Sequence, residues 1–442
     1  MRLPRIPALA AICVALAGPV VAQANLLIIV ADDLGVDMLE CYGEGQDLPH
    51  TPAIDSLALQ GVRFRNCWST PLCTPTRATL MTGRNAHRTG LGHIIEGGGL
   101  ELPLTELTLP EVLAQQSGGA WSMAAIGKWH LGATLDPDHP NASGWPHFVG
   151  NLGNLPLPGQ YYSWEKVRNG ATTTTTTYAT TDTVDEAVAW IGGAPEPWIC
   201  YLAFNAPHGP FHEPPAHLIH GELPDVDPRE LPRPFYKAAI EAMDTEMGRL
   251  LDYVSWATGP TNVIFLGDNG TPRDVVAPPT IPARAKLSVY EGGVNVPLIV
   301  SGPAVNGGGR WSEALVQTTD LFMTSLDLAG VTPSPSEVPE DSVSFAPYLA
   351  SASAPAARSF VYTERFRPNG FGPFVVRRRA VRGERYKLIR TNKSRARDEL
   401  YDLLTDRYEE VNLLDRDNGP PTPQVLAALY RLRAKMESVS GP

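Results

Sequence analysis

A cysteine at the start of an expected helix is the first group that could do chemistry. In "PLCTPTRATLMTGR", Cys73 is followed closely by Pro75 and Arg77. Pro75 suits the first turn of a helix, Thr74 its N-cap and Gly83 its C-terminal stop. Backbone N–H groups at such a helix start favour negative charge. The stretch is compatible with a functional cysteine that Arg77 approaches, with a simple thiolate nucleophile, and with a buried or disulfide-bonded cysteine.

Oxygen ligands follow two apolar runs elsewhere in the chain. "NLLIIV" leads to Asp32 and Asp33, and "NVIFLG" leads to Asp268 and Asn269. Either pair alone is typical of a turn at a strand end. Together, three carboxylates and one amide are the ligands that Ca²⁺ or Mg²⁺ prefers. The sequence therefore predicts a divalent cation site, with Ca²⁺ favoured and Mg²⁺ as the alternative.

Two further apolar runs end near cationic or imidazole side chains. "MAAIG" leads to Lys128 and His130, and "WICYLAF" leads to His208. Lys128 and His130 lie two residues apart on an expected extended run, so their side chains can face the same side. Taken one at a time, these residues are more typical of a surface lysine and of hydrogen-bonded histidines.

An α/β fold with a mostly parallel, buried sheet would bring the four runs together. After residue 24, β-rich apolar runs alternate with helix-like segments, which is the pattern of that fold. In open α/β sheets the ligand site lies beyond the carboxyl ends of the strands. Polar groups at four strand ends therefore predict a single site.

The C-terminal part has a different pattern. A stretch rich in Pro, Ser and Ala, about residues 332–358, indicates a connector, and within it we place the boundary between a large domain over 25–335 and a small α+β subdomain over 336–442. In this subdomain "AVRGERYKLIRT" and "DELYDLLTD" are expected to be exposed strands of an antiparallel sheet, and "PQVLAALYRLRAKMESV" an amphipathic helix. The threonine run 172–177 is expected to be a polar loop or an edge strand.

The N-terminus and the composition bear on location and partners. Residues 1–24 contain two arginines, an apolar run over 8–17 and an Ala-Gln-Ala ending, the layout of a secretory signal peptide. The alternative, a membrane anchor, needs an apolar run of about 20 residues. We therefore expect a periplasmic or secreted protein with no stable membrane insertion after cleavage. A net charge of -11 argues against nucleic acid as a partner.

The five cysteines are too few and too irregularly spaced for a disulfide scaffold. Whether Cys41, Cys67 and Cys200 form a disulfide stays open at this point.

The motifs resemble those of the sulfatase family, the formylglycine-dependent type I enzymes of the alkaline-phosphatase-like superfamily. "CTPTRATLMTGR" matches the family signature Cys-x-Pro-(Ser/Ala/Thr)-Arg, followed by an apolar pair and Thr-Gly. "IIVADDLGVD", "IGKWHLG", "APHGPF", "LGDNG" and "KLSVYEGGVNVP" are similar to further family blocks, with Asn295 where arginine is usual. The resemblance covers most of the chain. It implies a three-layer sandwich with a mostly parallel central sheet and a small C-terminal subdomain.

The resemblance also implies a modified nucleophile. A maturation enzyme would oxidise Cys73 to Cα-formylglycine, whose hydrated aldehyde attacks the sulfate ester, and Arg77 would hold the modified residue. The metal ligands would be Asp32, Asp33, the modified Cys73, Asp268 and Asn269.

The remaining roles follow from the same resemblance. Lys128 would contact the formylglycine and the sulfate, and His130 would take the proton whose loss expels sulfate. His208 and Lys286 would flank the leaving-group oxygen as proton donor and cation. Asp268 would double as the base that activates the attacking hydroxyl.

We therefore expect an exported, arylsulfatase-like sulfuric ester hydrolase that acts on an aryl or carbohydrate sulfate. Its partners would be the sulfated small molecule or glycan and the maturation enzyme. The alternatives are a phosphate or phosphonate monoester hydrolase of the same superfamily and a non-catalytic binder of sulfated glycans. The natural substrate stays open, because the expected rim loops, residues 97–103, 146–181 and 211–234, carry no pattern that identifies it. Among the other histidines, His87 and His93 are expected at the pocket rim, His212 near substrate and His50 in a structural role.

Overall fold

The computed structural model describes residues 23–95, 99–133, 135–392 and 396–440, and most of the chain forms a central ten-stranded sheet. The expected signal peptide, residues 1–24, lies almost entirely outside the described residues. The strand order is β10-β2-β9-β8-β1-β7-β3-β4-β5-β6. The strands are β1 Asn25–Ala31, β2 Val62–Trp68, β3 Ser122–Lys128, β4 His147–Asn151, β5 Trp164–Arg168, β6 Ala171–Thr175, β7 Trp198–Ala203, β8 Thr261–Gly267, β9 Leu298–Ser301 and β10 Arg310–Gln317.

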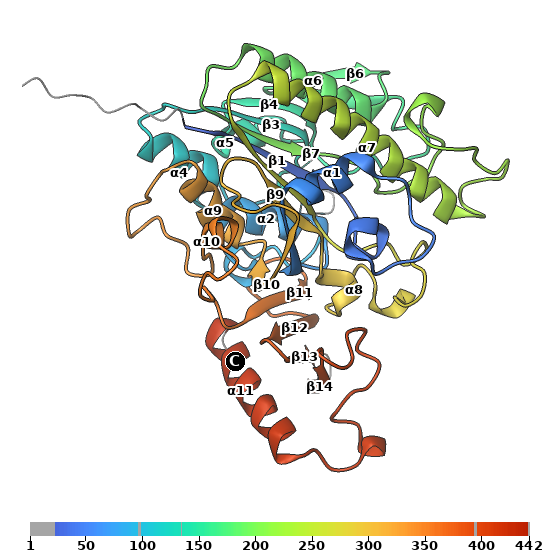
Figure 1. Ribbon diagram of the computed structural model, residues 1–442, viewed down its shortest axis with the longest axis vertical. Coiled ribbons are helices and arrows are strands. Elements are labelled where there is room, and N and C mark those ends of the chain that lie inside the picture. Colours follow the sequence, from blue (N-terminus) through green and yellow to red (C-terminus); the bar gives the residue numbers. More distant parts are fainter. Residues whose placement is uncertain (1–22, 96–98, 134, 393–395, 441–442) are drawn as a thin grey trace, which may run out of the picture.

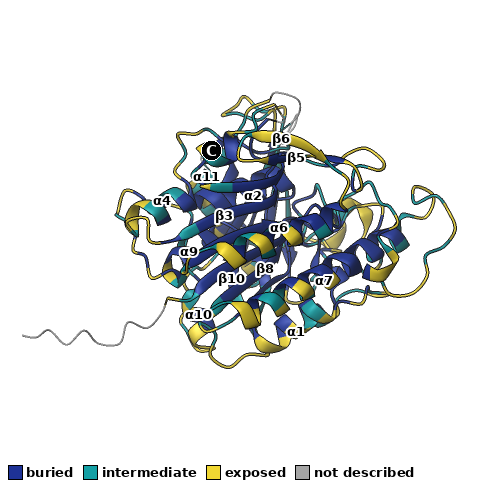
Figure 2. Cartoon of the chain, turned by 90° about the horizontal axis from the view of Figure 1, so that it is seen from above, coloured by how far each residue is buried: buried dark blue, intermediate teal, exposed yellow. Residues whose placement is uncertain are grey.

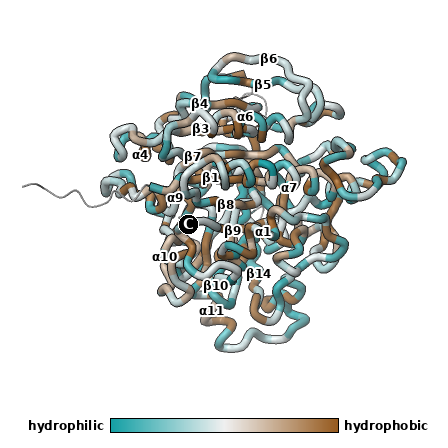
Figure 3. The backbone as a smooth tube through the Cα atoms, turned by 45° about the horizontal axis from the view of Figure 1, so that its top comes forward, coloured by the Kyte–Doolittle hydropathy of each residue, from teal (hydrophilic) through white to brown (hydrophobic). Residues whose placement is uncertain are grey.

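Helices cover both faces of this sheet, because successive side chains of each buried strand point to opposite sides. In β1, Leu26, Ile28 and Val30 belong to one hydrophobic cluster, and the residues between them belong to the other. Figures 2 and 3 show the central strands as buried and hydrophobic, and Figure 2 shows exposed residues on α6 and α7. One face packs against α2 Cys73–Thr82, α4 Leu109–Gln116, α9 Asp320–Leu328 and α10 Ala346–Ala350, and the other against α1 Pro52–Gln60, α6 Ala179–Gly193 and α7 Pro232–Ala257.

The predicted α/β fold with a mostly parallel sheet is confirmed. Strands β8, β1, β7 and β3 are neighbours and run parallel, so their carboxyl ends meet at one edge. These are the four apolar runs that end in polar groups. Most of the threonine run lies in β6, an edge strand, which is one of the two structures that we expected for it.

A second sheet of four antiparallel strands lies beside the first (Figure 1). It comprises β11 Val361–Arg367, β12 Val376–Arg382, β13 Tyr386–Asn392 and β14 Ala396–Asp402. The expectation of exposed strands is wrong, because Ala380, Val381 and Leu388 are fully buried. On one face of the sheet Ala380 packs in a cluster with Trp68, and on the other face Val381 and Leu388 pack against the last helix of the chain. The final helix, α11 Pro423–Ser440, is amphipathic as predicted and packs on this sheet through Leu429, Leu432 and other apolar residues. The domain boundary at 335/336 stays a prediction.

A buried ionic cluster joins the second sheet to the main body. Lys387 of β13 is fully buried, 3.0 Å from Glu291 and 2.9 Å from Glu409. Its ammonium also lies 4.6 Å from the ring centroid of Trp68 in β2. Glu291, at the start of α8 (Glu291–Val294), is 3.1 Å from Arg382 as well. The remaining short helices are α3 Ala86–Thr89 and α5 His139–Ala142.

Cys41, Cys67, Cys73 and Cys200 are all free thiols in the structure. Within the described ranges, none of the helices has the length and apolar character needed to cross a membrane.

We predict that Lys387→Met destabilises the fold strongly. Removing the shared cation leaves Glu409 without its ion pair and weakens the pairing of Glu291, and losing one partner of a buried ion pair costs about 3–5 kcal/mol. Urea unfolding of the variant should show a loss of this size. The matched control, Arg229→Met, breaks an exposed pair and should cost less than about 1 kcal/mol. Equal effects in the two variants would contradict the proposed importance of the buried cluster.

Candidate active site

Four buried oxygen ligands lie side by side where β1 and β8 end. The strands pair in parallel through Ala31 and Gly267, so the residues that follow are neighbours. The Asp33 backbone N–H donates to Asp268 Oδ1 at 3.0 Å, and Asn269 Nδ2 donates to Asp33 Oδ1 at 2.8 Å. Asp33 has a left-handed φ of 70°, which turns the chain at this point. Asp32, Asp33, Asp268 and Asn269 are all buried.

Helix α2 begins at Cys73 rather than after it. The predicted N-cap, Thr74, is wrong: Leu72 occupies that position, and Thr74 Oγ1 is buried without a hydrogen-bond partner. The preceding loop is held instead by Thr76, whose Oγ1 accepts the Thr70 backbone N–H at 3.1 Å. Gly83 ends the helix with a φ of 66°, as expected.

Cys73 is almost completely buried, and this environment disfavours a thiolate. Burial and the nearby Asp32 carboxylate raise the pKa of the Cys73 thiol well above its ordinary value. A reactive thiolate needs the opposite environment, one that stabilises negative charge. The burial of Cys73 and the raised pKa of its thiol therefore argue against the simple thiolate nucleophile.

Each of the three aspartates faces a cation. Lys128, the last residue of β3, contacts Asp32, Lys286 contacts Asp33, and Arg77 Nη2 lies 3.0 Å from Asp268 Oδ2. Arg77 also donates to the Lys128 carbonyl at 2.9 Å, which links α2 to β3. Lys128 donates to Asn154 Oδ1 at 2.5 Å.

The pKa values of Asp32 and Asp268 move in opposite directions. Burial alone would raise the pKa of Asp32, but Lys128, His208 and Arg77 hold it well below its usual range. Burial and the neighbouring Asp32 raise the pKa of Asp268. A group of buried acids this close together therefore depends on compensating positive charge.

His130 reaches the site by a route different from the predicted one. β3 ends at Lys128, and His130 has a left-handed φ of 61°, so the two residues do not share an extended run. The His130 backbone N–H donates to the Leu152 carbonyl at 3.0 Å, and its Nδ1 is buried without a partner. Burial and the Lys128 charge lower the pKa of His130 well below its ordinary value, which favours the neutral imidazole.

His208 lies on the other side of the acid cluster. Its Nε2 is 3.7 Å from Asp33 Oδ2, and its Nδ1 is 2.6 Å from the Gly209 carbonyl oxygen. The Tyr161 hydroxyl lies 2.7 Å from the His208 carbonyl oxygen. The sequence carried no signal for Asn154 or Tyr161, because each lies in a loop and becomes a neighbour of the site only through folding.

Two features fit a divalent cation. One ligand atom each from Asp32, Asp33, Cys73 and His208 lies within 4.8 Å of the others. Asp32 Oδ1 and Asn269 Oδ1 are buried acceptors without a hydrogen-bond donor. Asp268, whose Oδ2 accepts from Arg77, is outside the four-residue group, although it neighbours Asp33.

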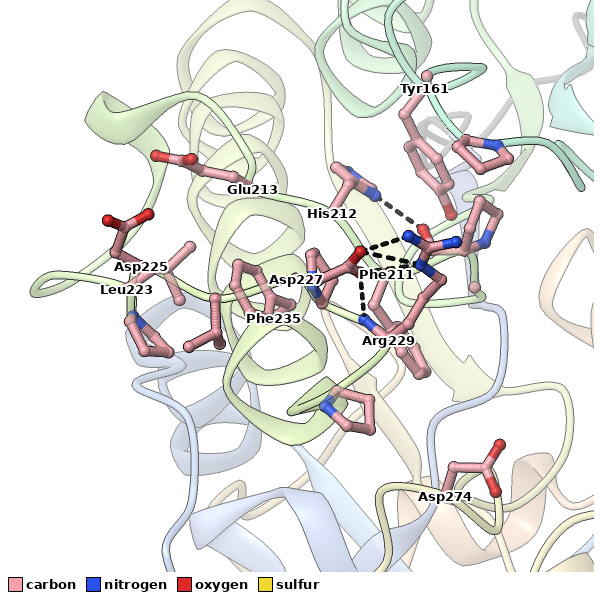
Figure 4. A pocket seen from close by; sticks show the side chains of 18 of the residues that line it. Tyr161, Phe211, His212, Glu213, Leu223, Asp225, Asp227, Arg229, Phe235 and Asp274 are labelled. Atoms are coloured by element: carbon pink, nitrogen blue, oxygen red, sulfur yellow. Dashed lines mark hydrogen bonds and ion pairs between the residues drawn. The ribbon is translucent and has the colours of Figure 1, made fainter.

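A large cavity is lined by the residues that follow His208, Gly209 to Glu213, and by several other segments, and Figure 4 shows many of its side chains. Its volume is about 1120 Å³, and two of the predicted rim loops, 146–181 and 211–234, contribute to its wall. We call it the aromatic cavity, because Tyr161, Tyr162, Phe211 and Phe235 line it. His212 also lines it and lies 3.0 Å from the Tyr178 hydroxyl. The third predicted rim loop, 97–103, falls partly outside the described residues.

The other histidines and Asn295 have structural contacts. His87 Nδ1 is 2.5 Å from Glu364, and His50 packs edge-on against His220 with ring centroids 4.3 Å apart. His93 borders a smaller, separate cavity, and its place at the rim of the substrate pocket stays a prediction. Asn295 donates to the Arg65 carbonyl at 3.2 Å.

Two protein-family models match the chain. Residues 24–331 match the family described as Sulfatase. Residues 285–436 match the family described as N-sulphoglucosamine sulphohydrolase, C-terminal.

Curated relatives cover about three quarters of the chain. It is similar to the N-acetylgalactosamine-6-sulfatase of Sus scrofa, with 30% identity over 371 residues, 74% of this chain and 66% of that protein. The Homo sapiens enzyme of the same name is 29% identical over 370 residues, 74% of this chain and 65% of that protein. The chain thus spans slightly less than two thirds of the length of these relatives.

Solved structures are similar over nearly the whole chain. The crystal structure of Ps i-CgsB in complex with k-i-k-neocarrahexaose has a TM-score of 0.79 and 25% identity, and the match covers 95% of this chain and 93% of that one. The structure of BT4656 in complex with its substrate D-Glucosamine-2-N, 6-O-disulfate has a TM-score of 0.73 and 21% identity, and the match covers 95% and 98%. The second likeness concerns the fold alone.

Proposed function

Because this chain belongs to the sulfatase family, we propose that it hydrolyses the sulfate ester of a carbohydrate to an alcohol and inorganic sulfate. One observation carries the proposal: Cys73 lies in the first turn of α2, directly against Asp32, Asp33 and His208. The names of the curated relatives and the ligands of the similar structures support a sugar sulfate as substrate.

Two groups that the chain would acquire complete this site. Cys73, converted to formylglycine by a maturation enzyme, would supply a hydroxyl nucleophile in place of a thiol whose burial disfavours ionisation. A divalent cation, Ca²⁺ rather than Mg²⁺, would supply charge that stabilises a sulfate oxygen. Its ligands would be Asp32, Asp33, residue 73, Asp268 and Asn269.

The chain's own cations surround the position of the sulfate. Lys128 contacts Asp32, Lys286 contacts Asp33, and Arg77 of α2 lies 3.0 Å from Asp268. Fixed positive groups stabilise charge that develops in a transition state, and this is usually the largest catalytic contribution. We assign Lys128 and Lys286 to the sulfate and leaving-group oxygens and Arg77 to holding residue 73. Asp268 would serve as the base for the attacking hydroxyl.

We assign His208 as the proton donor for the leaving group. Its Nδ1, 2.6 Å from the Gly209 carbonyl, would hold one ring proton, and Nε2 would carry the second proton, which is transferred. Burial lowers the pKa of His208, and the Asp33 carboxylate near Nε2 opposes this and favours the charged form that can donate. Tyr161 fixes the backbone of this loop from behind.

We assign His130 to accept a proton in the half of the reaction that releases sulfate. Its buried Nδ1 has no hydrogen-bond partner among the described residues. Burial and the neighbouring Lys128 lower the pKa of the ring, which favours the neutral form that a base requires.

Location and domain organisation belong to the same proposal. Residues 1–24 would direct export to the periplasm or beyond. The catalytic domain would end near residue 335, and the remainder would form the C-terminal subdomain.

The first prediction from the proposed function concerns the reaction and its nucleophile. The protein, made in a host with the maturation enzyme, should hydrolyse sugar sulfates and 4-nitrophenyl sulfate in preference to 4-nitrophenyl phosphate. Cys73→Ala should lower kcat/KM by on the order of a thousandfold or more with the fold retained, whereas Cys200→Ala should retain activity. Mass spectrometry of the peptide containing residue 73 should show loss of the thiol. A preference for phosphate, or an active protein with an unmodified thiol, would contradict the proposal.

The second prediction concerns the metal. Elemental analysis should find one divalent ion per chain, expected to be calcium, and Asp32→Asn and Asn269→Ala should each lower the metal content. Asp252→Asn, on the exposed side of α7, is the control and should bind as much metal as the wild type. Full activity in metal-free protein would exclude a catalytic ion.

The third prediction separates the two histidines. His208→Ala should damage hydrolysis of a sugar sulfate far more than that of 4-nitrophenyl sulfate, because a good leaving group needs little protonation. His130→Ala should release a burst of alcohol without a matching amount of inorganic sulfate, because only sulfate release needs that base. If both variants lose activity equally on both substrates and show no burst, the assignment is wrong.

A further inference from the structure

Four arginines gather at a small cavity beside the proposed catalytic site. Arg365 and Arg367 of β11, Arg378 of β12 and Arg273 from the loop after β8 line a space of about 240 Å³. Arg365 and Arg367 lie two apart on one strand and so share a face. Arg378 of β12 pairs directly with Arg365 on the neighbouring strand β11. We call this set the arginine pocket.

None of the four arginines has a carboxylate partner among the residues that the structure describes. Other arginines of the same sheet are paired: Arg377 lies 2.9 Å from Glu364, and Arg390 lies 2.7 Å from Asp398. The difference marks the arginine pocket as a place where positive charge is left uncompensated.

This arrangement is unfavourable without a ligand. Like charges directly opposite each other in a sheet repel. Burial and the charges of Arg378, Arg367 and Arg273 lower the pKa of Arg365 to about 10. The Nε of Arg378 is buried and has no hydrogen-bond partner. An oxyanion would relieve each of these costs, because guanidinium groups bind sulfate or carboxylate oxygens in pairs.

The arginine pocket is connected to the catalytic site through the backbone of residues 286 and 287. Arg273 Nε donates to the Lys286 carbonyl at 3.3 Å, and Arg365 Nη1 donates to the Leu287 carbonyl at 2.6 Å. The side chain of Lys286 contacts Asp33 in the catalytic site. A group bound in the pocket would therefore lie close to the leaving-group side of the sulfate ester.

The aromatic cavity on the His208 side has the opposite charge. Glu213, Asp225, Asp227 and Asp274 line it, and its one arginine, Arg229, pairs with Asp227 (Figure 4). Asp274 follows Arg273 directly in the chain, so one loop borders both spaces. An anionic part of a substrate would be attracted to the arginine pocket and repelled from the aromatic cavity.

We propose that the arginine pocket binds a second anionic group, a sulfate or a carboxylate, of the same carbohydrate whose sulfate ester is cleaved. The proposal rests on the proposed function and narrows it to a substrate with at least two negative groups. The aromatic cavity then receives an uncharged part of the glycan, since sugar rings pack on aromatic side chains without needing charge.

Matched substrates test the proposal. The probes are a monosulfated disaccharide with a neutral second sugar, the same disaccharide with a second sulfate on that sugar, and one with a uronic acid there. Arg367→Gln and Arg378→Gln are the test variants, because neither side chain is hydrogen-bonded to the catalytic loop. Arg416→Gln, an exposed arginine distant in sequence, is the control.

For the wild type, we expect a kcat/KM at least about tenfold higher on a dianionic disaccharide than on the monosulfated one, as one charge-assisted contact provides. Each test variant should lose about that factor on the dianionic substrate, mainly through KM, and change little on the monosulfated one. The control should match the wild type on all three. The second anion is identified by comparing the two dianionic probes: it is the group, sulfate or uronate, that raises kcat/KM more relative to the monosulfated disaccharide. Equal changes on mono- and dianionic substrates, or none, would overturn the proposal.

A binding measurement separates this proposal from the proposed function. Calorimetry with the Cys73→Ala protein measures affinity for the disulfated disaccharide without turnover. If no substrate is hydrolysed but Arg378→Gln in this background weakens binding about tenfold, the pocket is supported and the reaction is not. If hydrolysis proceeds but binding is the same with and without Arg378, the pocket is refuted and the reaction stands.

Discussion

Three aspartates held out of water at one edge of the sheet are the constraint on which the rest of the structure depends. Asp32, Asp33 and Asp268 are each no more than 2% exposed. Buried carboxylates are tolerated only when cations and hydrogen-bond donors compensate them. Arg77 comes from α2, Lys128 from β3 and Lys286 from the loop after β8, so no single element can build the site.

The second sheet contacts three segments next to this site. Thr363 of β11 donates to the Ser69 carbonyl just before α2, and the next residue, Glu364, binds His87 just after it. Arg365 then binds the Leu287 carbonyl next to Lys286. One strand thus holds the segments on both sides of the Cys73 helix, and the buried cluster around Lys387 anchors the sheet that contains it. The C-terminal sheet thus supports the segments that carry the Cys73 helix and Lys286.

Charge is distributed unevenly around the acid cluster. The acidic aromatic cavity includes the residues that follow His208, whereas the arginines gather where Arg273 and Arg365 contact the carbonyls of residues 286 and 287. Local fields of this kind can oppose the sign of the whole molecule, so a chain with a net charge of -11 can still attract an anion. If the proposed reaction and the proposed second anion site are right, strand ends and α2 carry the chemistry, and loops and β11 carry the selection of the substrate.

The fold class, the family and the group of polar residues at the strand ends could be predicted from the sequence alone. They follow from short contiguous patterns: continuous apolar runs, acids directly after two of those runs, and the stretch around Cys73. Four features became visible only in the folded chain. Leu72 occupies the N-cap position of α2, and His130 follows β3 through a left-handed backbone conformation. Asn154 contacts Lys128, and Arg365 faces Arg378 with no carboxylate partner among the described residues. The contacts of His130, Asn154 and Arg365 depend on which separate segments pack together and in what register, and local residue preferences carry no information about a partner outside the segment.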